Sequence, residues 1–181
     1  MNDPAVRRRP RRSGLAFVVA LVLIAIAGWS AWWFYGAARV GSSVDAQIAQ
    51  LREGGYNIRH EPVRVSGYPF RFKAEVANFS WVDASGVGLQ AARLEGAANA
   101  YDPRHWVVTA PVGLTYLRGP KGPVAIGGRA IRASVAGEGA IPRIAVELLE
   151  PTFTPGVGAQ PFPIVSAKSA VLNIRPAQNQ A

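Results

Sequence analysis

Few side chains in this sequence have the types and spacings that catalysis or metal binding requires. His60 is followed by Glu61, and Asp102 lies three residues before His105, so each pair offers two metal ligands. A catalytic zinc ion takes three protein ligands and a supporting shell of partners. No third ligand lies at a suitable spacing, and the chain contains no cysteine. We therefore expect neither a metal site nor a cofactor.

The acidic residues and the hydroxyl groups also form no recognisable catalytic pattern. A glycosidase needs two carboxylates that face each other across a cleft, and no spacing here pairs two acids. The chain has no Gly-x-Ser-x-Gly elbow, and its glycine-containing segments at 85–90 and 125–130 match no phosphate-binding template. We therefore expect a protein that is not an enzyme. The acids considered are Asp83, Glu95, Asp102, Glu138, Glu147 and Glu150.

The positive charge is concentrated near the N-terminus. The net charge is +9, but five of the 20 basic residues fall within residues 7–12, directly before an apolar block. Membrane topology explains this cluster better than nucleic-acid binding, which needs a basic surface with stacking aromatic side chains. We expect no nucleic-acid partner.

Residues 14–35, GLAFVVALVLIAIAGWSAWWFY, form the apolar block and include no charged residue. As a helix they would span about 33 Å, enough for a hydrocarbon core of about 30 Å. The basic tail, residues 1–13, would stay in the cytoplasm by the positive-inside rule, and the aromatic end of the block would form a belt at the far interface. The expected interface residues are Arg7, Arg8, Arg9, Arg11, Arg12, Trp29, Trp32, Trp33 and Tyr35.

A cleaved signal peptide is the alternative for this segment. The apolar region of a signal peptide has about 7–15 residues and is followed by small residues. Residues 14–35 exceed that length and end in bulky aromatic side chains, although Ala37-Ala38 keeps a cleavage site open. We expect an uncleaved anchor in the inner membrane. The rest of the chain would then lie in the periplasm of a Gram-negative bacterium.

Residues 36–55 are predicted to form a juxtamembrane helix. Apolar residues recur on one side of it at Val40, Val44, Ile48 and Leu51, and Gly54-Gly55 follows as a stop. We expect this helix to continue the membrane helix or to dock its apolar stripe on the domain that follows.

From Tyr56 onward, short alternating runs are punctuated by glycine and proline. No long helical pattern separates these runs, which favours antiparallel neighbours joined by short turns. The sequence therefore predicts a mainly β fold, with an antiparallel, curved sheet over residues 56–175 and a frayed tail at 176–181. Strands are expected near 56–65, 69–82, 87–101, 105–117, 124–136, 141–153 and 163–175.

The segment SGYPFRFKAEV, residues 66–76, alternates most clearly. It places Phe70 and Phe72 on one face of a strand, and Arg71 and Lys73 on the other. One interpretation is an ordinary half-buried strand. The other is an apolar lining for acyl chains, with the two basic side chains directed towards water or anionic headgroups.

Two segments of the chain carry a family resemblance. GGYNIRHEPVRVSGYPFRFKAEVANFSW and YDPRHWVVTAPVGLTYL follow an arginine-flanked anchor, with residues 67–72 and 101–104 as their cores. They resemble the bacterial domain-of-unknown-function family 2125, which is common in alphaproteobacteria. The resemblance implies an anchored envelope protein with a β-rich body, and it implies no known activity. Typical members of the family are longer, so the β body of this chain would be short or incomplete.

A looser similarity links such proteins to AsmA-like envelope proteins, whose curved sheets are associated with lipid transfer or outer-membrane homeostasis. We expect a non-catalytic, inner-membrane-anchored periplasmic protein in envelope maintenance, with membrane lipid as its partner. The expected lipid-binding residues are Phe70, Phe72, Arg71 and Lys73. The alternative is a scaffold module that binds another envelope protein. A hydrolase acting on envelope polymers would need a cluster of acids or serines that the sequence does not show.

Overall fold

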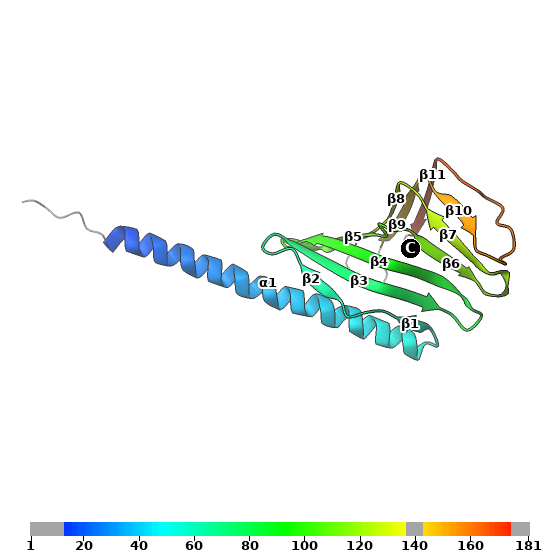
Figure 1. Cartoon of the computed structure of the whole chain (residues 1–181). Coiled ribbons are helices and arrows are strands. Elements are labelled where there is room, and N and C mark those ends of the chain that lie inside the picture. The colour runs from blue at the N-terminus through cyan, green and yellow to red at the C-terminus, as the bar shows by residue number, and fades with distance from the viewer. Residues whose placement is uncertain (1–12, 137–142, 175–181) are drawn as a thin grey trace, which may run out of the picture.

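A computed structural model describes residues 13–136 and 143–174 of the chain. The five arginines of the basic tail, Glu138 and the tail at 176–181 lie outside these residues. The described N-terminal part is one long helix, α1, which runs from Ser13 to Glu53 (Figure 1). The membrane helix and the juxtamembrane helix expected from the sequence are therefore a single element. No proline interrupts residues 13–53, and the segment is rich in alanine and leucine, which favours an unbroken helix.

Two glycines end the helix. Gly55 has a φ of 89°, a left-handed conformation that glycine adopts without steric cost. The amide of Gly55 donates to the carbonyl of Arg52, and the amide of Tyr56 donates to the carbonyl of Leu51. This pair of bonds is the Schellman arrangement, which satisfies the last carbonyls of a helix and turns the chain back. The reversal brings the first strand alongside α1.

The rest of the described chain is mostly β. It forms one 11-stranded sheet in which every pair of neighbours is antiparallel, as the alternation predicted. A short 3₁₀ helix, Gly119–Lys121, makes a turn in the Gly-Pro-Lys-Gly-Pro segment at residues 119–123. The strands are β1 Asn57–Arg59, β2 Arg64–Ser66, β3 Arg71–Val82, β4 Val87–Asn99, β5 Asp102–Thr109, β6 Leu114–Arg118, β7 Pro123–Gly127, β8 Ala130–Ala136, β9 Arg143–Leu149, β10 Thr152–Pro155 and β11 Ser169–Ile174.

The long hairpin β3–β4 is the centre of the sheet, and the sheet forks beside it (Figure 1). β1 and β2 pair with the outer edge of β3. On the other edge of β4, the N-terminal residues pair with β6 and the C-terminal residues pair with β5. One arm continues as β6, β7 and β10, and the other as β5, β8, β9 and β11. The sheet is not closed, so it leaves an open side.

Several expected strands are each split in two. The expected strand 105–117 breaks at residues 110–113, because Pro111 cannot donate to a ladder and Gly113 has a φ of 84°. The expected strand 124–136 breaks near Gly128, whose φ is 150°. The expected strand 141–153 breaks at Glu150, whose φ is 49°. At each break the direction of the chain changes, so that the strands before and after it belong to different arms of the sheet.

The alternation along β3 is interrupted once. Asn78 has a φ of 50°, and no strand pair forms at this position although Ala77 and Phe79 on either side are paired with β4. The side chain of Asn78 is exposed, and its amide donates to a carboxylate oxygen of Glu61 at 2.6 Å. The apolar face therefore continues at Phe79 in place of residue 78.

α1 docks on the sheet through aromatic side chains. Trp33, Phe72 and Ala100 form a buried cluster, with Ala37, Val65 and Trp106 packed around it. The indole N–H of Trp33 donates to the carbonyl of Arg71 at 3.0 Å. At the other end of the contact, the guanidinium of Arg52 donates twice to the carbonyl of Ile58, at 2.8 and 3.0 Å. These contacts hold the C-terminal half of α1 along the β3–β4 hairpin.

Candidate functional site

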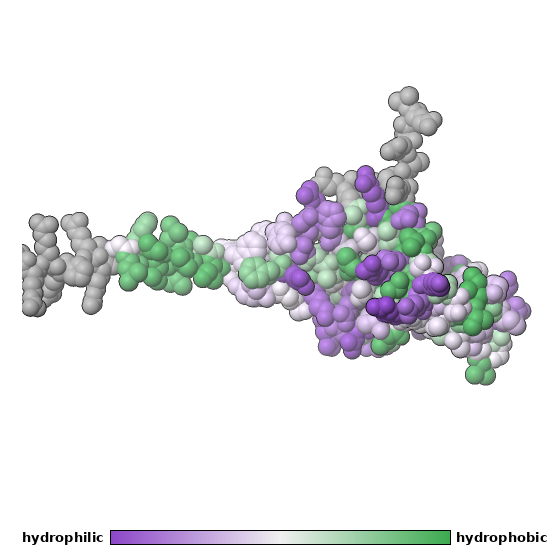
Figure 2. Space-filling model, turned by 90° about the horizontal axis from the view of Figure 1, so that it is seen from above, coloured by the Kyte–Doolittle hydropathy of each residue, from purple (hydrophilic) through white to green (hydrophobic). Residues whose placement is uncertain are grey.

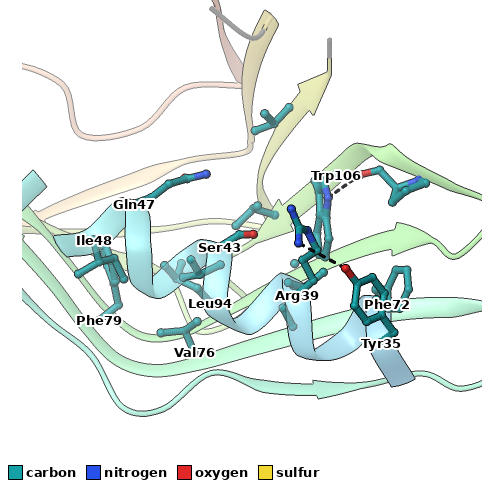
Figure 3. Close-up of a pocket in the computed structure, with 18 of the residues that line it drawn as sticks. Tyr35, Arg39, Ser43, Gln47, Ile48, Phe72, Val76, Phe79, Leu94 and Trp106 are labelled. Atoms are coloured by element: carbon teal, nitrogen blue, oxygen red, sulfur yellow. Dashed lines mark hydrogen bonds between the residues drawn. The ribbon is translucent and has the colours of Figure 1, made fainter. Parts of the chain in front are cut away.

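An apolar groove lies between α1 and the sheet (Figure 3). Its volume is about 690 Å³, within the range of about 300–1,000 Å³ that is typical of small-molecule sites. Along α1 it extends from Trp32 to Leu51, which corresponds to about 28 Å of helix. Side chains of α1 form one wall, β3 and β4 form the floor, and β5 and β8 form the second wall.

The helix wall is built by residues spaced three or four apart. The stripe predicted from the sequence, Val40, Val44, Ile48 and Leu51, lies in this wall. These side chains face the sheet across the groove: Ile48 is buried, Val40 and Val44 are half-buried, and Leu51 is exposed. The sequence identified the stripe but gave no indication of the open space beside it.

The floor is built by alternate residues of two paired strands. Val76 on β3 is opposite Leu94 on β4, and Ala74 is opposite Gly96. All four line the groove, because residues two apart on a strand point to the same face. Phe79 extends the floor beyond the interruption at Asn78.

Two glycines set how closely the walls approach. A Cβ on Gly36 of α1 would lie 2.8 Å from Cζ of Phe72, so only glycine lets the helix approach β3 this closely. A Cβ on Gly96 would lie 3.3 Å from the ring of Trp106, which crosses β4 at this point. The indole N–H of Trp106 donates to the carbonyl of Pro103 at 2.9 Å, which fixes the ring as part of the second wall.

Polar groups lie along one side of the helix wall. Arg39, Ser43 and Gln47 are on successive turns of α1 and border the groove (Figure 3). The guanidinium of Arg39 donates to the hydroxyl of Tyr35 at 3.4 Å, and no carboxylate among the described residues forms an ion pair with it. Arg39 therefore offers an exposed positive charge beside an apolar channel.

The structure separates the four residues that were expected to bind lipid. Phe72 is 2% exposed and lines the end of the groove, whereas Phe70 is 66% exposed and lies in the turn before β3. Strand β3 begins at Arg71, so the expectation that Phe70 and Phe72 lie on one strand face is wrong. Arg71 and Lys73 are exposed and do not line the groove. Lys73 instead pairs with Glu95 at 3.1 Å.

The four aromatic residues expected at the interface lie on two sides of α1. Trp29 and Trp33 face the turn that joins β2 to β3, and the indole N–H of Trp29 donates to the carbonyl of Pro69 at 3.0 Å. Trp32 and Tyr35 line the groove. The rings of Trp29 and Trp32 are 5.1 Å apart, so the two sets are in contact.

The residues considered for catalysis or metal binding form hydrogen bonds or ion pairs with nearby groups. His105 donates to a carboxylate oxygen of Asp102 at 2.8 Å, and this hydrogen bond lowers the pKa of Asp102 below its ordinary value of 3.8. His60 bonds to the backbone oxygen of Glu61. Within the described part of the chain, no three histidine or acidic side chains are grouped to hold a metal ion. Four other acids considered for catalysis lie in the described part of the chain, and each contacts a nearby group: Asp83 the β3–β4 turn, Glu95 Lys73 and Arg93, Glu147 Arg132, and Glu150 Arg129.

α1 also contains the candidate membrane span. Among the described residues it is the one helix long and apolar enough to cross a bilayer, and its most apolar window is not covered by the rest of the protein. Figure 2 shows this apolar stretch projecting beyond the sheet. The helix that contains the candidate span thus also forms one wall of the groove.

A family model described as "Uncharacterized protein conserved in bacteria (DUF2125)" matches residues 33–181. The chain belongs to this family. The DUF2125 match covers the groove-forming half of α1 and every strand, and it begins at Trp33 in the buried cluster. No curated protein and no solved structure matches the chain.

Proposed function

We propose that this DUF2125 member is a single-pass inner-membrane protein whose periplasmic sheet domain holds a phospholipid acyl chain in the groove beside α1. The protein acts without catalysis, in maintenance of the cell envelope. The observation that carries the proposal is the continuity between the apolar helix and the groove wall. The AsmA-like similarity expected from the sequence favours the same role.

The dimensions of the groove fit an acyl chain. A hydrocarbon core of about 30 Å contains two leaflets, so the chains of one leaflet occupy about 15 Å. The groove runs along about 28 Å of helix and can therefore accept an extended chain along its length. Apart from Arg39, Ser43 and Gln47 along one side of the helix wall, its lining is mostly apolar, so each buried methylene would contribute about 0.8 kcal/mol.

Charge at the groove favours a phospholipid over a neutral lipid. Arg39 lies one turn beyond Tyr35, at the end of the groove nearest the candidate span, and has no carboxylate partner among the described residues. A guanidinium binds phosphate oxygens through parallel hydrogen bonds. The acyl chain would then lie deeper in the groove, with the phosphate at Arg39.

Retained lipid tests this proposal. The full chain is purified in mild detergent, and phospholipid per mole of protein is measured by mass spectrometry for the wild type, Val44→Trp and Ala46→Trp. Val44 lines the groove and Ala46 lies on the exposed side of the same helix. We expect Val44→Trp to lose several-fold more lipid than Ala46→Trp. Lipid around the membrane span would be retained equally by both variants, so equal retention would exclude the groove as the site.

Topology is tested with a single cysteine, since the chain has none. Val157→Cys lies in an exposed loop of the sheet domain. We expect a membrane-impermeant maleimide to label it in intact spheroplasts. Labelling only after lysis would place the domain in the cytoplasm.

One observation favours a second role as a scaffold. β11 pairs with β9 on one side, and no other described strand pairs with it. Val171, Leu172 and Ile174 on this strand are exposed, and an open apolar edge can accept a strand from a partner. Crosslinking from Leu172 in intact cells would show a reproducible protein partner if this edge is used.

A further inference from the structure

Three exposed aromatic side chains lie where α1 leaves the sheet domain. Tyr68 and Phe70 are in the turn between β2 and β3, and Tyr101 is in the turn between β4 and β5. The amide of Ala100 donates to the carbonyl of Phe70 at 2.9 Å, so the two turns are held together. Phe70 is 66% exposed and Tyr101 is 72% exposed. We call these three residues the aromatic tip.

The position of the aromatic tip along α1 is fixed by several contacts. The indole N–H of Trp29 donates to the carbonyl of Pro69, and the hydroxyls of Ser30 and Tyr68 bond at 2.8 Å. The ring of Tyr68 also stacks on the ring of Phe34, with centroids 5.9 Å apart. The tip therefore lies beside residues 29–34 of the helix.

Helix length then places the tip at the bilayer surface. The apolar stretch begins at Gly14, after the arginines, and a hydrocarbon core needs about 20 residues. The far boundary of the core thus falls near Trp33. Trp29 lies about 6 Å nearer the bilayer centre, at 1.5 Å per residue. A turn bonded to Trp29 must reach the boundary between headgroups and acyl chains.

The composition of the tip suits that depth. No charged residue occurs in residues 65–70 or 98–101, and the first charges after them are Arg71 and Asp102. The polar groups that join the tip to α1 are satisfied: Ser30 donates to the carbonyl of Ile26, so Tyr68 donates to Ser30. Tyrosine and other aromatic side chains are enriched at this level of a membrane.

We propose that the aromatic tip inserts into the outer face of the same membrane that α1 crosses, with a phospholipid surface as its partner. This inference rests on the membrane anchor of the proposed function and not on lipid in the groove. Insertion of the tip places the Arg39 end of the groove at the headgroup level. The anchored protein is thus fixed to the bilayer by α1 and by two turns of the sheet domain.

Fluorescence from single cysteines tests the insertion, because the full chain has no cysteine of its own. Phe70→Cys, Tyr101→Cys, Val157→Cys and Leu21→Cys are labelled with an environment-sensitive fluorophore and reconstituted into phosphatidylcholine–phosphatidylglycerol vesicles. Val157 is 106% exposed in the loop that follows β10, and Figure 1 shows β10 at the end of the sheet domain away from the turn between β2 and β3. Leu21 lies within the candidate span.

We expect nitroxide on shallow acyl positions to quench the labels at 70 and 101 several-fold more than the label at 157, while aqueous iodide shows the reverse order. Equal iodide quenching at 70, 101 and 157 would overturn the proposal, provided the label at 21 is quenched by lipid. If the label at 21 is not quenched by lipid, α1 does not cross the bilayer as proposed. The proposed insertion of the aromatic tip is then contradicted as well. Repeating the measurement with Val44→Trp separates the two proposals, because filling the groove should leave quenching at 70 and 101 unchanged.

Discussion

The ring of Trp33 on α1 lies stacked on the ring of Phe72 on β3, with centroids 5.5 Å apart and planes inclined by 23°. Both residues are buried, and Ala100 closes the cluster from the β4–β5 turn. This contact joins the helix to the sheet at the end nearest the candidate membrane span. Phe72 also lines the adjacent end of the groove.

Two neighbouring phenylalanines should differ sharply in their effect on stability. Phe72→Ala removes a buried ring and should lower the free energy of unfolding by about 3–5 kcal/mol. Phe70→Ala removes a ring that is 66% exposed, and should change it by less than about 0.5 kcal/mol in detergent solution. Chemical denaturation of the full chain in detergent measures both. Equal effects would show that the Trp33–Phe72 contact does not hold the helix.

Two glycines of α1 form a second matched pair. Gly36→Ala introduces a Cβ 2.8 Å from Cζ of Phe72, which is too buried to move away, so we expect a loss of stability and a lower unfolding midpoint. Gly41→Ala meets nothing within 4 Å and should gain up to about 1 kcal/mol, because alanine favours a helix over glycine. A gain for both variants would mean that α1 does not approach β3 as closely as described.

The β3–β4 turn should weaken in acid. One carboxylate oxygen of Asp83 accepts hydrogen bonds from the hydroxyl and amide of Ser85 and from the amide of Val87. The hydroxyl bond from Ser85 contributes most to lowering the pKa of Asp83 below its ordinary 3.8. Because the folded pKa lies below the unfolded one, the stabilisation is complete above pH 3.8 and is lost as the pH falls through the folded pKa.

Asp83→Asn tests this dependence. The difference in unfolding free energy between wild type and Asp83→Asn should be largest near neutral pH and should shrink on acidification. Ser85→Ala keeps the two backbone N–H groups that donate to Asp83. At neutral pH its unfolding free energy should therefore differ from that of the wild type by less than that of Asp83→Asn does. A difference that is independent of pH would mean that the charge of Asp83 does not contribute.

The proposed binding of the lipid headgroup by Arg39 can be measured separately from the binding of the acyl chain in the groove. If the proposed function holds, Arg39→Gln should retain lipid in the groove but lose several-fold in preference for anionic over zwitterionic phospholipid. Arg93→Gln is the control, since Arg93 lies away from the groove and pairs with Glu75 and Glu95. An unchanged preference in Arg39→Gln would remove Arg39 from the site.

The sequence predicted the antiparallel, mainly β fold and the apolar stripe of α1, because both depend on local periodicity. It did not predict that Phe70 and Phe72 are so differently buried, since that depends on where β3 begins. It also missed the interruption at Asn78, although the apolar residues change there from even positions (Phe72, Ala74, Val76) to odd ones (Phe79, Trp81).

The groove itself required the three-dimensional structure. Arg39, Ser43 and Gln47 are spaced as an ordinary solvated helix face would be, and nothing in their spacing indicates an apolar channel beside them. Gly36 and Gly96 were the available signals, since glycine inside a helix or strand often marks a close approach of another group.

The absence of a break in α1 between the candidate span and the groove has a mechanical consequence. A helix accommodates a thinner bilayer by tilting, and here any tilt is transmitted directly to the sheet domain. In a thick bilayer the domain stands upright, and in a thin one it leans with the helix. In the membrane-anchored protein that we propose, the direction in which the groove opens would therefore follow the local thickness of the bilayer.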